Sequence, residues 1–92
     1  MKKKIIARFF INDESVETFK ALAAKLVAET RLEEGCLFYK LFQDVENKNE
    51  FVFIEEYRDE AAMTLHSKSA YLQAFISGIN GLQSRELIIE VI

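Results

Sequence analysis

The sequence contains no proline, no tryptophan, one histidine, one cysteine and only three glycines in 92 residues. A single cysteine, Cys36, cannot form an internal disulfide, which is typical of proteins kept in a reducing compartment. With one histidine and one cysteine, the chain also lacks the ligands for a compact zinc site or for an iron site built on two histidines. We therefore expect a cytoplasmic protein that holds no metal.

Sequence motifs of several large enzyme classes are missing as well. There is no glycine-rich nucleotide loop, no G-x-S-x-G and no C-x-x-C, so nucleotide or flavin binding and triad hydrolysis have no support. The net charge is −3 and the only basic run is Lys2–Lys4, which argues against nucleic acid. The apolar run Ile5–Ile11 is interrupted by Arg8 and is too short to cross a membrane. We expect no cofactor, no nucleic-acid partner and no membrane partner.

The chain is rich in apolar side chains, since half of its residues are hydrophobic and eight are phenylalanine. A chain of this length forms one domain, residues 1–92, and buries only about two-thirds of its unfolded surface or less. This apolar content predicts a dense core together with a surface for a partner chain or an apolar ligand.

The first half of the chain alternates between strand and helix patterns. Residues 5–11 are β-branched and aromatic and predict a strand, after which Asn12 or Asp13 is expected to cap a helix. The helical period stops at Gly35, which is expected to turn the chain, and strand periodicity follows over 36–45 and 50–58. The polar residues 46–49 between these strands predict a hairpin turn.

The second half predicts two helical stretches and a last strand. Asp59 is expected to cap a short helix that runs through His66, and a second helix ends at Asn80-Gly81, with Leu72, Phe75, Ile76 and Ile79 on one side. Residues 84–92 form the final strand. The order β-α-β-β-α-β predicts an α+β, ferredoxin-like subunit, whose helices cover one face of the sheet. Because the strands are apolar on both faces, we expect a homodimer joined through the sheets.

One stretch of the chain is more specific than these patterns. From Glu29 to Asp44 the sequence reads ETRxExGCxxYxLxxD, and it is followed by the strand Phe51–Tyr57, then by an alanine at 61 or 62 and by His66. In order and spacing, this resembles the antibiotic biosynthesis monooxygenase family, whose small members include quinol monooxygenases and enzymes that process autoinducer sugars. The resemblance covers residues 2–91. It departs from the family at Tyr57, where the family usually has Trp, and at Tyr71, where a second His is often found.

The resemblance implies a dimeric α/β barrel with a pocket between the sheet and the helices of each subunit. Period-two alternation places five side chains on the strand face toward that pocket, namely Tyr39, Leu41, Phe53, Glu55 and Tyr57. A buried carboxyl such as Glu55 needs a hydrogen-bond partner or a raised pKa. Two roles are open for it, a catalytic one and a structural hydrogen bond.

Candidate catalytic residues are His66, Tyr57 and Glu55, and candidate substrate-binding residues are Tyr39, Leu41, Phe53 and Tyr71. His66 is a natural proton acceptor near neutral pH, although a histidine near a helix end is also a common C-terminal cap. Tyr57 and Tyr71 have the chemistry to bind a substrate oxygen, or else they are core aromatics with satisfied hydroxyls. Cys36, which has no cationic neighbour in sequence, is interpreted as an inert thiol.

The resulting hypothesis is a cofactor-independent monooxygenase that acts on a small aromatic, quinol-like or enolisable substrate. The alternative is a non-catalytic dimeric barrel that binds a small molecule or serves in a stress response, as the missing Trp and second His would favour. A third possibility is the isomerisation or degradation of a small phosphorylated sugar, but no cluster of Arg or Lys at a helix start supports phosphate binding. Haem degradation is disfavoured, because the haem-degrading enzymes that this chain resembles carry a haem-ligating His in the later helix, where residues 70–80 contain none.

Overall fold

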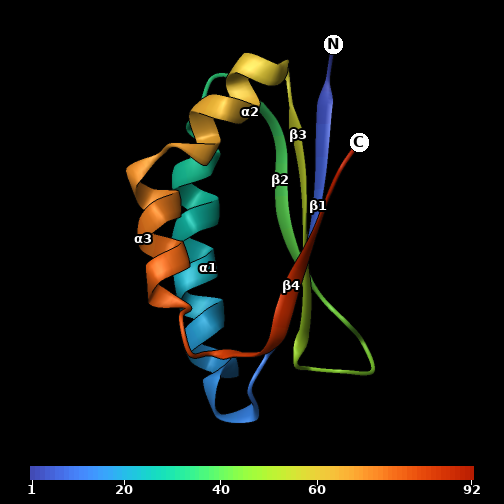
Figure 1. Ribbon diagram of the computed structural model, residues 1–92, viewed down its shortest axis with the longest axis vertical. Coiled ribbons are helices and arrows are strands. Elements are labelled where there is room, and N and C mark those ends of the chain that lie inside the picture. The colour runs from blue at the N-terminus through green and yellow to red at the C-terminus, as the bar shows by residue number, and fades with distance from the viewer.

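The computed structural model describes residues 1–92 as a four-stranded antiparallel sheet with helices on one face (Figure 1). The elements in chain order are β1 (Lys3–Ile11), the short 3-10 helix η1 (Asp13–Ser15), α1 (Val16–Thr30), β2 (Cys36–Gln43), β3 (Glu50–Tyr57), α2 (Glu60–Ser67), α3 (Ala70–Gly78) and β4 (Gln83–Val91). The strand order is β2-β3-β1-β4. The predicted ferredoxin-like α+β fold is thus confirmed.

The start of the first helix differs from the prediction. Neither Asn12 nor Asp13 caps α1 with its side chain, and a turn of 3-10 helix precedes α1 instead. The Asn12 side chain donates to the carbonyl oxygen of Gly81 at 3.2 Å, and the Asp13 carboxylate accepts from Asn49 at 2.8 Å. Both side chains are therefore used to join the end of β1 to neighbouring loops.

Gly35 lies in a turn as expected, but the helical segment does not run as far as Gly35. The helix ends at Thr30, and backbone hydrogen bonds such as Glu33 N–H to Thr30 O (3.0 Å) form the turns that follow. Gly35 does not have a positive φ. A Cβ atom at Gly35 would instead lie 2.4 Å from the Cβ of Ala62, so glycine is needed because this loop touches α2. The contact brings Glu33 beside α2.

The later predictions fit more closely. Asp59 caps α2 as expected, since its Oδ1 accepts from the Ala62 N–H at 2.8 Å. Ser69 separates α2 from α3 and caps α3 through Leu72 N–H at 3.3 Å. Gly81 has a φ of 87°, which glycine adopts without strain. Strand ends shift by one or two residues; β2, for example, stops at Gln43 because the Asp44 carboxylate accepts two backbone N–H groups of the hairpin.

The core lies between the helices and the inner face of the sheet. Its centre is a cluster of aromatic rings with centroids 4.7 to 6.1 Å apart, formed by Phe9, Phe19, Phe51, Phe53 and Phe75. Such tilted and edge-on pairs stabilise a fold beyond the area that they bury. The dense core expected from eight phenylalanines is present, and five of them form it.

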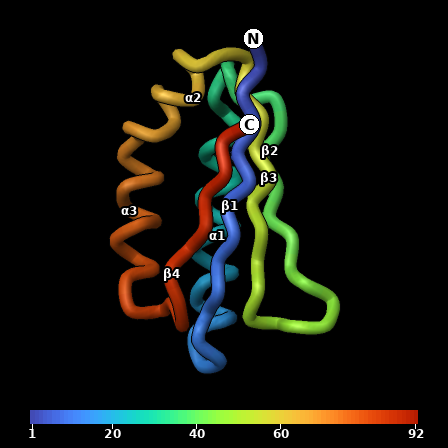
Figure 2. Tube along the Cα trace, turned by 45° about the vertical axis from the view of Figure 1, so that its right-hand side comes forward, coloured from blue at the N-terminus to red at the C-terminus, as the bar shows by residue number.

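The outer face of the sheet carries no helix (Figure 2). Its register brings Phe42, Val52 and Arg8 into one row and Lys40, Ile54 and Ile6 into the next, so each row holds two apolar side chains and one charged side chain. Phe38 and Phe42 are 36% and 44% exposed. The outer face is therefore a mixture of apolar and charged side chains. No helix of the chain is long and apolar enough to span a membrane.

Candidate functional site

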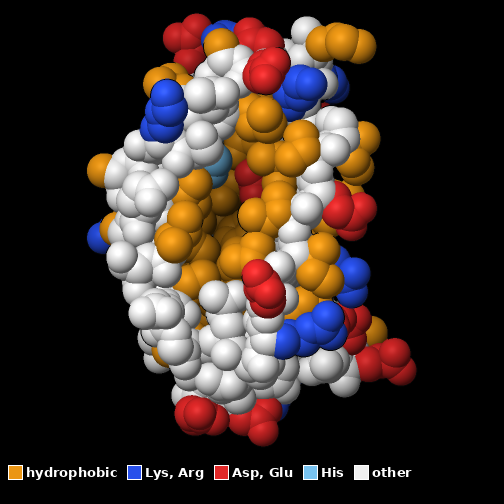
Figure 3. All heavy atoms as spheres, in the orientation of Figure 1, with side chains coloured by type: hydrophobic (Ala, Val, Ile, Leu, Met, Phe, Trp, Pro, Cys, Tyr) orange, Lys and Arg blue, Asp and Glu red, His pale blue; other side chains and the backbone are white.

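A cavity of about 220 Å³ lies between the inner face of the sheet and the helices α2 and α3. Figure 3 shows it as an apolar hollow with the histidine on its wall. Seventeen residues line it and thirteen of them are hydrophobic. The polar ones are Glu55, His66, Ser67 and Gln83. Because a cavity of about 150 Å³ suffices for benzene, this space suits a compact ligand somewhat larger than a single ring.

Short local contacts place His66 at this cavity. The Asp59 cap sets the start of α2, and Ala62 and His66 follow one helical turn apart on its buried side. Ala62 packs against Gly35, which fixes the distance between α2 and the loop after α1. As a result, the imidazole is 4% exposed and points between that loop and the sheet.

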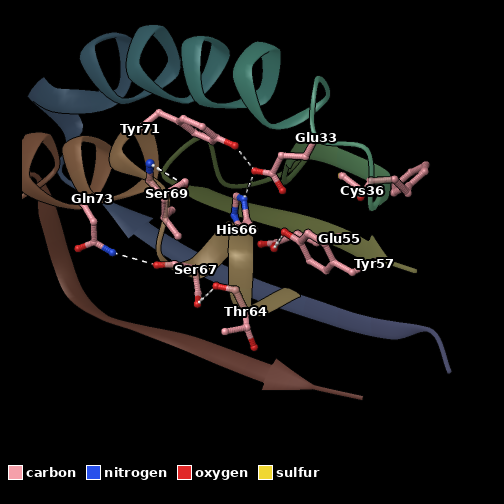
Figure 4. Close-up of polar contacts among 12 residues, drawn as sticks. Glu33, Cys36, Glu55, Tyr57, Thr64, His66, Ser67, Ser69, Tyr71 and Gln73 are labelled. Atoms are coloured by element: carbon pink, nitrogen blue, oxygen red, sulfur yellow. Dashed lines mark hydrogen bonds and ion pairs between the residues drawn. The ribbon is translucent and has the colours of Figure 1, made fainter. Parts of the chain in front are cut away.

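The imidazole of His66 makes one side-chain hydrogen bond, between Nδ1 and Glu33 Oε2 at 2.8 Å. The hydroxyl of Tyr71 donates to the same oxygen. Burial and this hydrogen bond raise the pKa of Tyr71 to about 12. His66 thus does not cap its helix with its side chain, as the alternative interpretation held, but bonds to a carboxylate from a different element (Figure 4).

Aromatic rings surround the imidazole. The ring centroids of Tyr39 and Tyr57 lie 5.3 and 5.4 Å from that of His66, and the ring of Tyr71 lies at 6.4 Å. Tyr39 comes from β2 and Tyr57 from β3, so the sheet forms one side of this enclosure. Burial and the nearby Glu55 raise the pKa of both Tyr39 and Tyr57, which keeps both hydroxyls protonated.

Glu55 is the second titratable group on the cavity wall and is 6% exposed. Its Oε1 accepts a hydrogen bond of 2.7 Å from the Tyr57 hydroxyl. Burial raises the pKa of the Glu55 carboxyl, whereas the Tyr57 hydrogen bond and the neighbouring His66 oppose that rise. Both features expected of a buried acid, a partner and a raised pKa, are therefore found together.

The structure brings only some of the candidate residues to the cavity. Tyr39, Phe53, Glu55 and His66 line it. Tyr57 lies behind Glu55 and is fully buried. The two others face different surface grooves: Leu41 faces one between α1 and β2, and Tyr71 faces one between α1 and α3.

Glu33 was missed by the sequence analysis, although it occupies a fixed position in the ETRxExGC stretch. It has no periodic pattern to mark it, because it lies in the turns between α1 and β2. The sequence feature that could have identified Glu33 is its position two residues before Gly35, in the most specific stretch of the chain. Cys36, at the end of the same loop, is half-buried, and burial raises the pKa of its thiol, as suits an unreactive cysteine.

Comparison with known proteins identifies relatives over nearly the whole chain. Residues 4–78 match the family model described as antibiotic biosynthesis monooxygenase. The chain is 40% identical over 67 residues to a Bacillus subtilis (strain 168) protein named "Putative monooxygenase YcnE", a match that covers 73% of this chain and 70% of that protein.

Solved structures agree with the sequence match. A crystal structure described as an antibiotic biosynthesis monooxygenase superimposes with a TM-score of 0.93 at 34% identity, covering 98% of this chain and 95% of the other. The structure of Rv0793 from Mycobacterium tuberculosis superimposes with a TM-score of 0.94 at 26% identity, covering 100% of this chain and 93% of the other.

Proposed function

The chain belongs to the antibiotic biosynthesis monooxygenase family, and from this premise we propose that it is a cofactor-independent monooxygenase acting on a compact aromatic, quinol-like or enolisable substrate. The observation that carries the proposal is that His66 and Glu55 both lie on the wall of a largely apolar cavity. Family membership supports the class of reaction, and the size and lining of the cavity support the kind of substrate.

The proposed reaction starts with a proton transfer to His66. Removal of a phenolic or enolic proton leaves an electron-rich anion, and imidazole is suited to accept that proton near neutral pH. The anion then reduces oxygen, so the substrate itself supplies the electrons. One oxygen atom enters the substrate, and the other leaves as water with the two hydrogens that the substrate loses.

The remaining residues of the site have supporting roles in this proposal. Tyr39 and Phe53 present aromatic surface to a planar substrate. Glu55, with its raised pKa, is suited to return a proton to a reduced-oxygen intermediate, and Tyr57 holds the Glu55 carboxyl in place. The apolar lining keeps water away from that intermediate.

We also propose that the protein works as a cytoplasmic homodimer. The helix-free outer face of the sheet supports the dimer, since it leaves Phe38 and Phe42 partly exposed and pairs Phe42 with the apolar Val52. The single cysteine supports a reducing compartment. Both cavities of such a dimer would stay open to small molecules, because each lies on the helix side of its own sheet.

Oxygen uptake across a panel of hydroquinones, anthrones and enediols tests the function. We expect the purified protein to consume oxygen with at least one class, and His66→Ala to lower turnover by about 10² to 10⁴, the usual effect of removing a general base. Tyr57→Phe is measured beside it. This variant removes the hydroxyl that bonds to Glu55 but keeps the aromatic ring, so it separates an effect on activity from an effect on packing.

Two results would count against the proposal. Binding of the panel compounds with no oxygen uptake would favour the non-catalytic binding protein. Turnover by His66→Ala at the wild-type rate would refute the role of the histidine.

A further inference from the structure

We propose that Glu33 is a positioning residue, which holds His66 as the Nδ1–H tautomer and so leaves Nε2 free as the proton acceptor. In this arrangement Tyr71 does not bind substrate but holds Glu33 in place. The function of Nε2 rests on the proposed monooxygenase activity, whereas the tautomer is a property of the free protein.

The first support is the geometry at one oxygen atom. Glu33 Oε2 lies 2.8 Å from His66 Nδ1 and also accepts from the Tyr71 hydroxyl. A carboxylate oxygen only accepts hydrogen bonds, so the facing ring nitrogen must carry the proton. An unprotonated Nδ1 would set two acceptors against each other at hydrogen-bond distance.

The second support is that the pair is withdrawn from water. The His66 and Glu33 side chains are 4% and 13% exposed. Glu33 does not line the cavity, whereas His66 does. Because the two ring nitrogens point in different directions, a ring with Nδ1 turned to Glu33 directs Nε2 away from Glu33, and this ring belongs to the cavity wall.

The third support is the role of the Tyr71 hydroxyl. Its pKa of about 12 keeps it protonated at neutral pH, so it donates to the Glu33 side chain and helps to hold that side chain in place. Tyr71 comes from α3, Glu33 from the loop after α1 and His66 from α2. Three elements therefore meet at one carboxylate oxygen, and this limits how the imidazole can rotate.

Other titratable groups also face His66 and have to be weighed against Glu33. Tyr39 approaches from β2, and Glu55 and Tyr57 approach from β3. Glu55 is the rival carboxylate, but its hydrogen bond goes to Tyr57. Of these two acids, only Glu33 is hydrogen-bonded to the imidazole.

The tautomer can be measured directly, since His66 is the only histidine. Two-bond ¹⁵N–¹H correlation spectra, recorded at a pH where the imidazole is neutral, distinguish Nδ1–H from Nε2–H. We expect Nδ1–H in the wild-type protein. An Nε2–H signal there would overturn the proposal without the need for any variant.

Glu33→Gln tests the cause. Its amide can donate as well as accept, so we expect the single Nδ1–H tautomer to be lost and turnover to fall by about 10- to 10⁴-fold. Glu34→Gln is the matched control, because it removes the same charge in the same turn while its side chain is 93% exposed and contacts only Arg58. The control should keep the wild-type tautomer. A Glu33→Gln spectrum identical to wild type would refute the proposal.

Tyr71→Phe tests the assignment of Tyr71. It keeps the ring but removes the donor to Glu33, so we expect a lower kcat with the KM of an active panel compound nearly unchanged. A raised KM with an unchanged kcat would mean that Tyr71 contacts the substrate, and would overturn this part of the proposal. If no compound is turned over, the proposed function fails, while the tautomer in the wild-type protein still decides the role of Glu33.

Discussion

At the scale of single residues, the site combines two carboxyl groups with different surroundings. Glu33 accepts from His66 and Tyr71, whereas Glu55 lies in an aromatic, buried position with one donor, Tyr57. Burial favours the neutral form of a carboxyl, and the raised pKa of Glu55 follows from it. Because the pKa of Glu55 differs between the folded and the unfolded protein, the free energy of unfolding depends on pH.

The pKa of Glu55 predicts the direction of that link. Because the folded-state pKa lies above the unfolded value of about 4.3, the folded state keeps a proton that the unfolded state has lost. This stabilising contribution is complete below the unfolded pKa and is lost as pH rises through the folded pKa. We expect Glu55→Gln to gain stability over wild type as pH rises from about 4 to 8.

The measurement is the thermal midpoint of both proteins across this range at one protein concentration. The glutamine keeps an oxygen that can accept from Tyr57, so the comparison isolates the charge. Glu34→Gln, at an exposed position, should show no such gain. A difference between Glu55→Gln and wild type that stays constant with pH would contradict the account.

At the scale of elements, the site depends on how closely the loop after α1 approaches α2. The contact between Gly35 and Ala62 sets the distance between the loop and α2, and the Asp59 cap sets where α2 begins and so which of its side chains face the loop. Gly35 lies two residues after Glu33, and Ala62, which takes part in both contacts, lies one helical turn before His66. Glu33 and His66 are the two groups that bond to each other. Local packing therefore controls the geometry of the polar contact.

Gly35→Ala tests this dependence. The added methyl would meet the Ala62 side chain at 2.4 Å, so we expect a loss of about 1 to 3 kcal/mol in the free energy of unfolding and a loosened contact between Glu33 and His66. Chemical denaturation and the His66 tautomer spectrum measure the two effects. Gly78→Ala is the control: its methyl would lie 3.3 Å from a flexible Leu22 end, and alanine favours a helix. Equal stability of the two variants would refute the steric role of Gly35.

The same elements show what the sequence could and could not predict. Alternation along β2 and β3 correctly placed Tyr39, Phe53 and Glu55 on one face, because side chains of a strand must alternate. Leu41 shares that face but lies toward α1, outside the cavity, since periodicity does not say where helices cover a sheet.

Contacts made by residues outside the periodic helix and strand patterns could not be predicted from the sequence. The bond between Glu33 and His66 depends on the path of a loop, and the need for Gly35 depends on Ala62, which lies far along the chain. Both became visible only when the loop and α2 were placed together. The cap at Asp59, by contrast, is a local signal and was predicted correctly.

At the scale of the whole molecule, the sheet divides two different surfaces. One face holds the core and the cavity under the helices, and the other has no helix on it (Figure 1). On that outer face, apolar residues such as Ile6 and Ile54 lie beside charged groups such as Lys40. A partner sheet packed on this face would cover the apolar side chains.

We expect wild-type protein to sediment as a dimer, and Ile54→Lys to shift it toward monomer, because the new charge would lie beside Lys40 in the middle of the outer face. Leu65→Lys is the control, since Leu65 is 72% exposed on α2, on the helix side of the sheet. Sedimentation velocity at micromolar concentration measures both. A stable wild-type monomer that binds no hydrophobic dye would refute the dimer.

The central claim is that this protein catalyses oxygen insertion without a cofactor, and isotope labelling tests it most directly. Purified protein is given ¹⁸O₂ with the panel compound that supports the fastest oxygen uptake, and the product is analysed by mass spectrometry. We predict one labelled oxygen atom in the product and the other in water, with the amount of labelled product formed by His66→Ala lowered in proportion to its turnover. Product without label, or oxygen recovered entirely as hydrogen peroxide, would contradict the account.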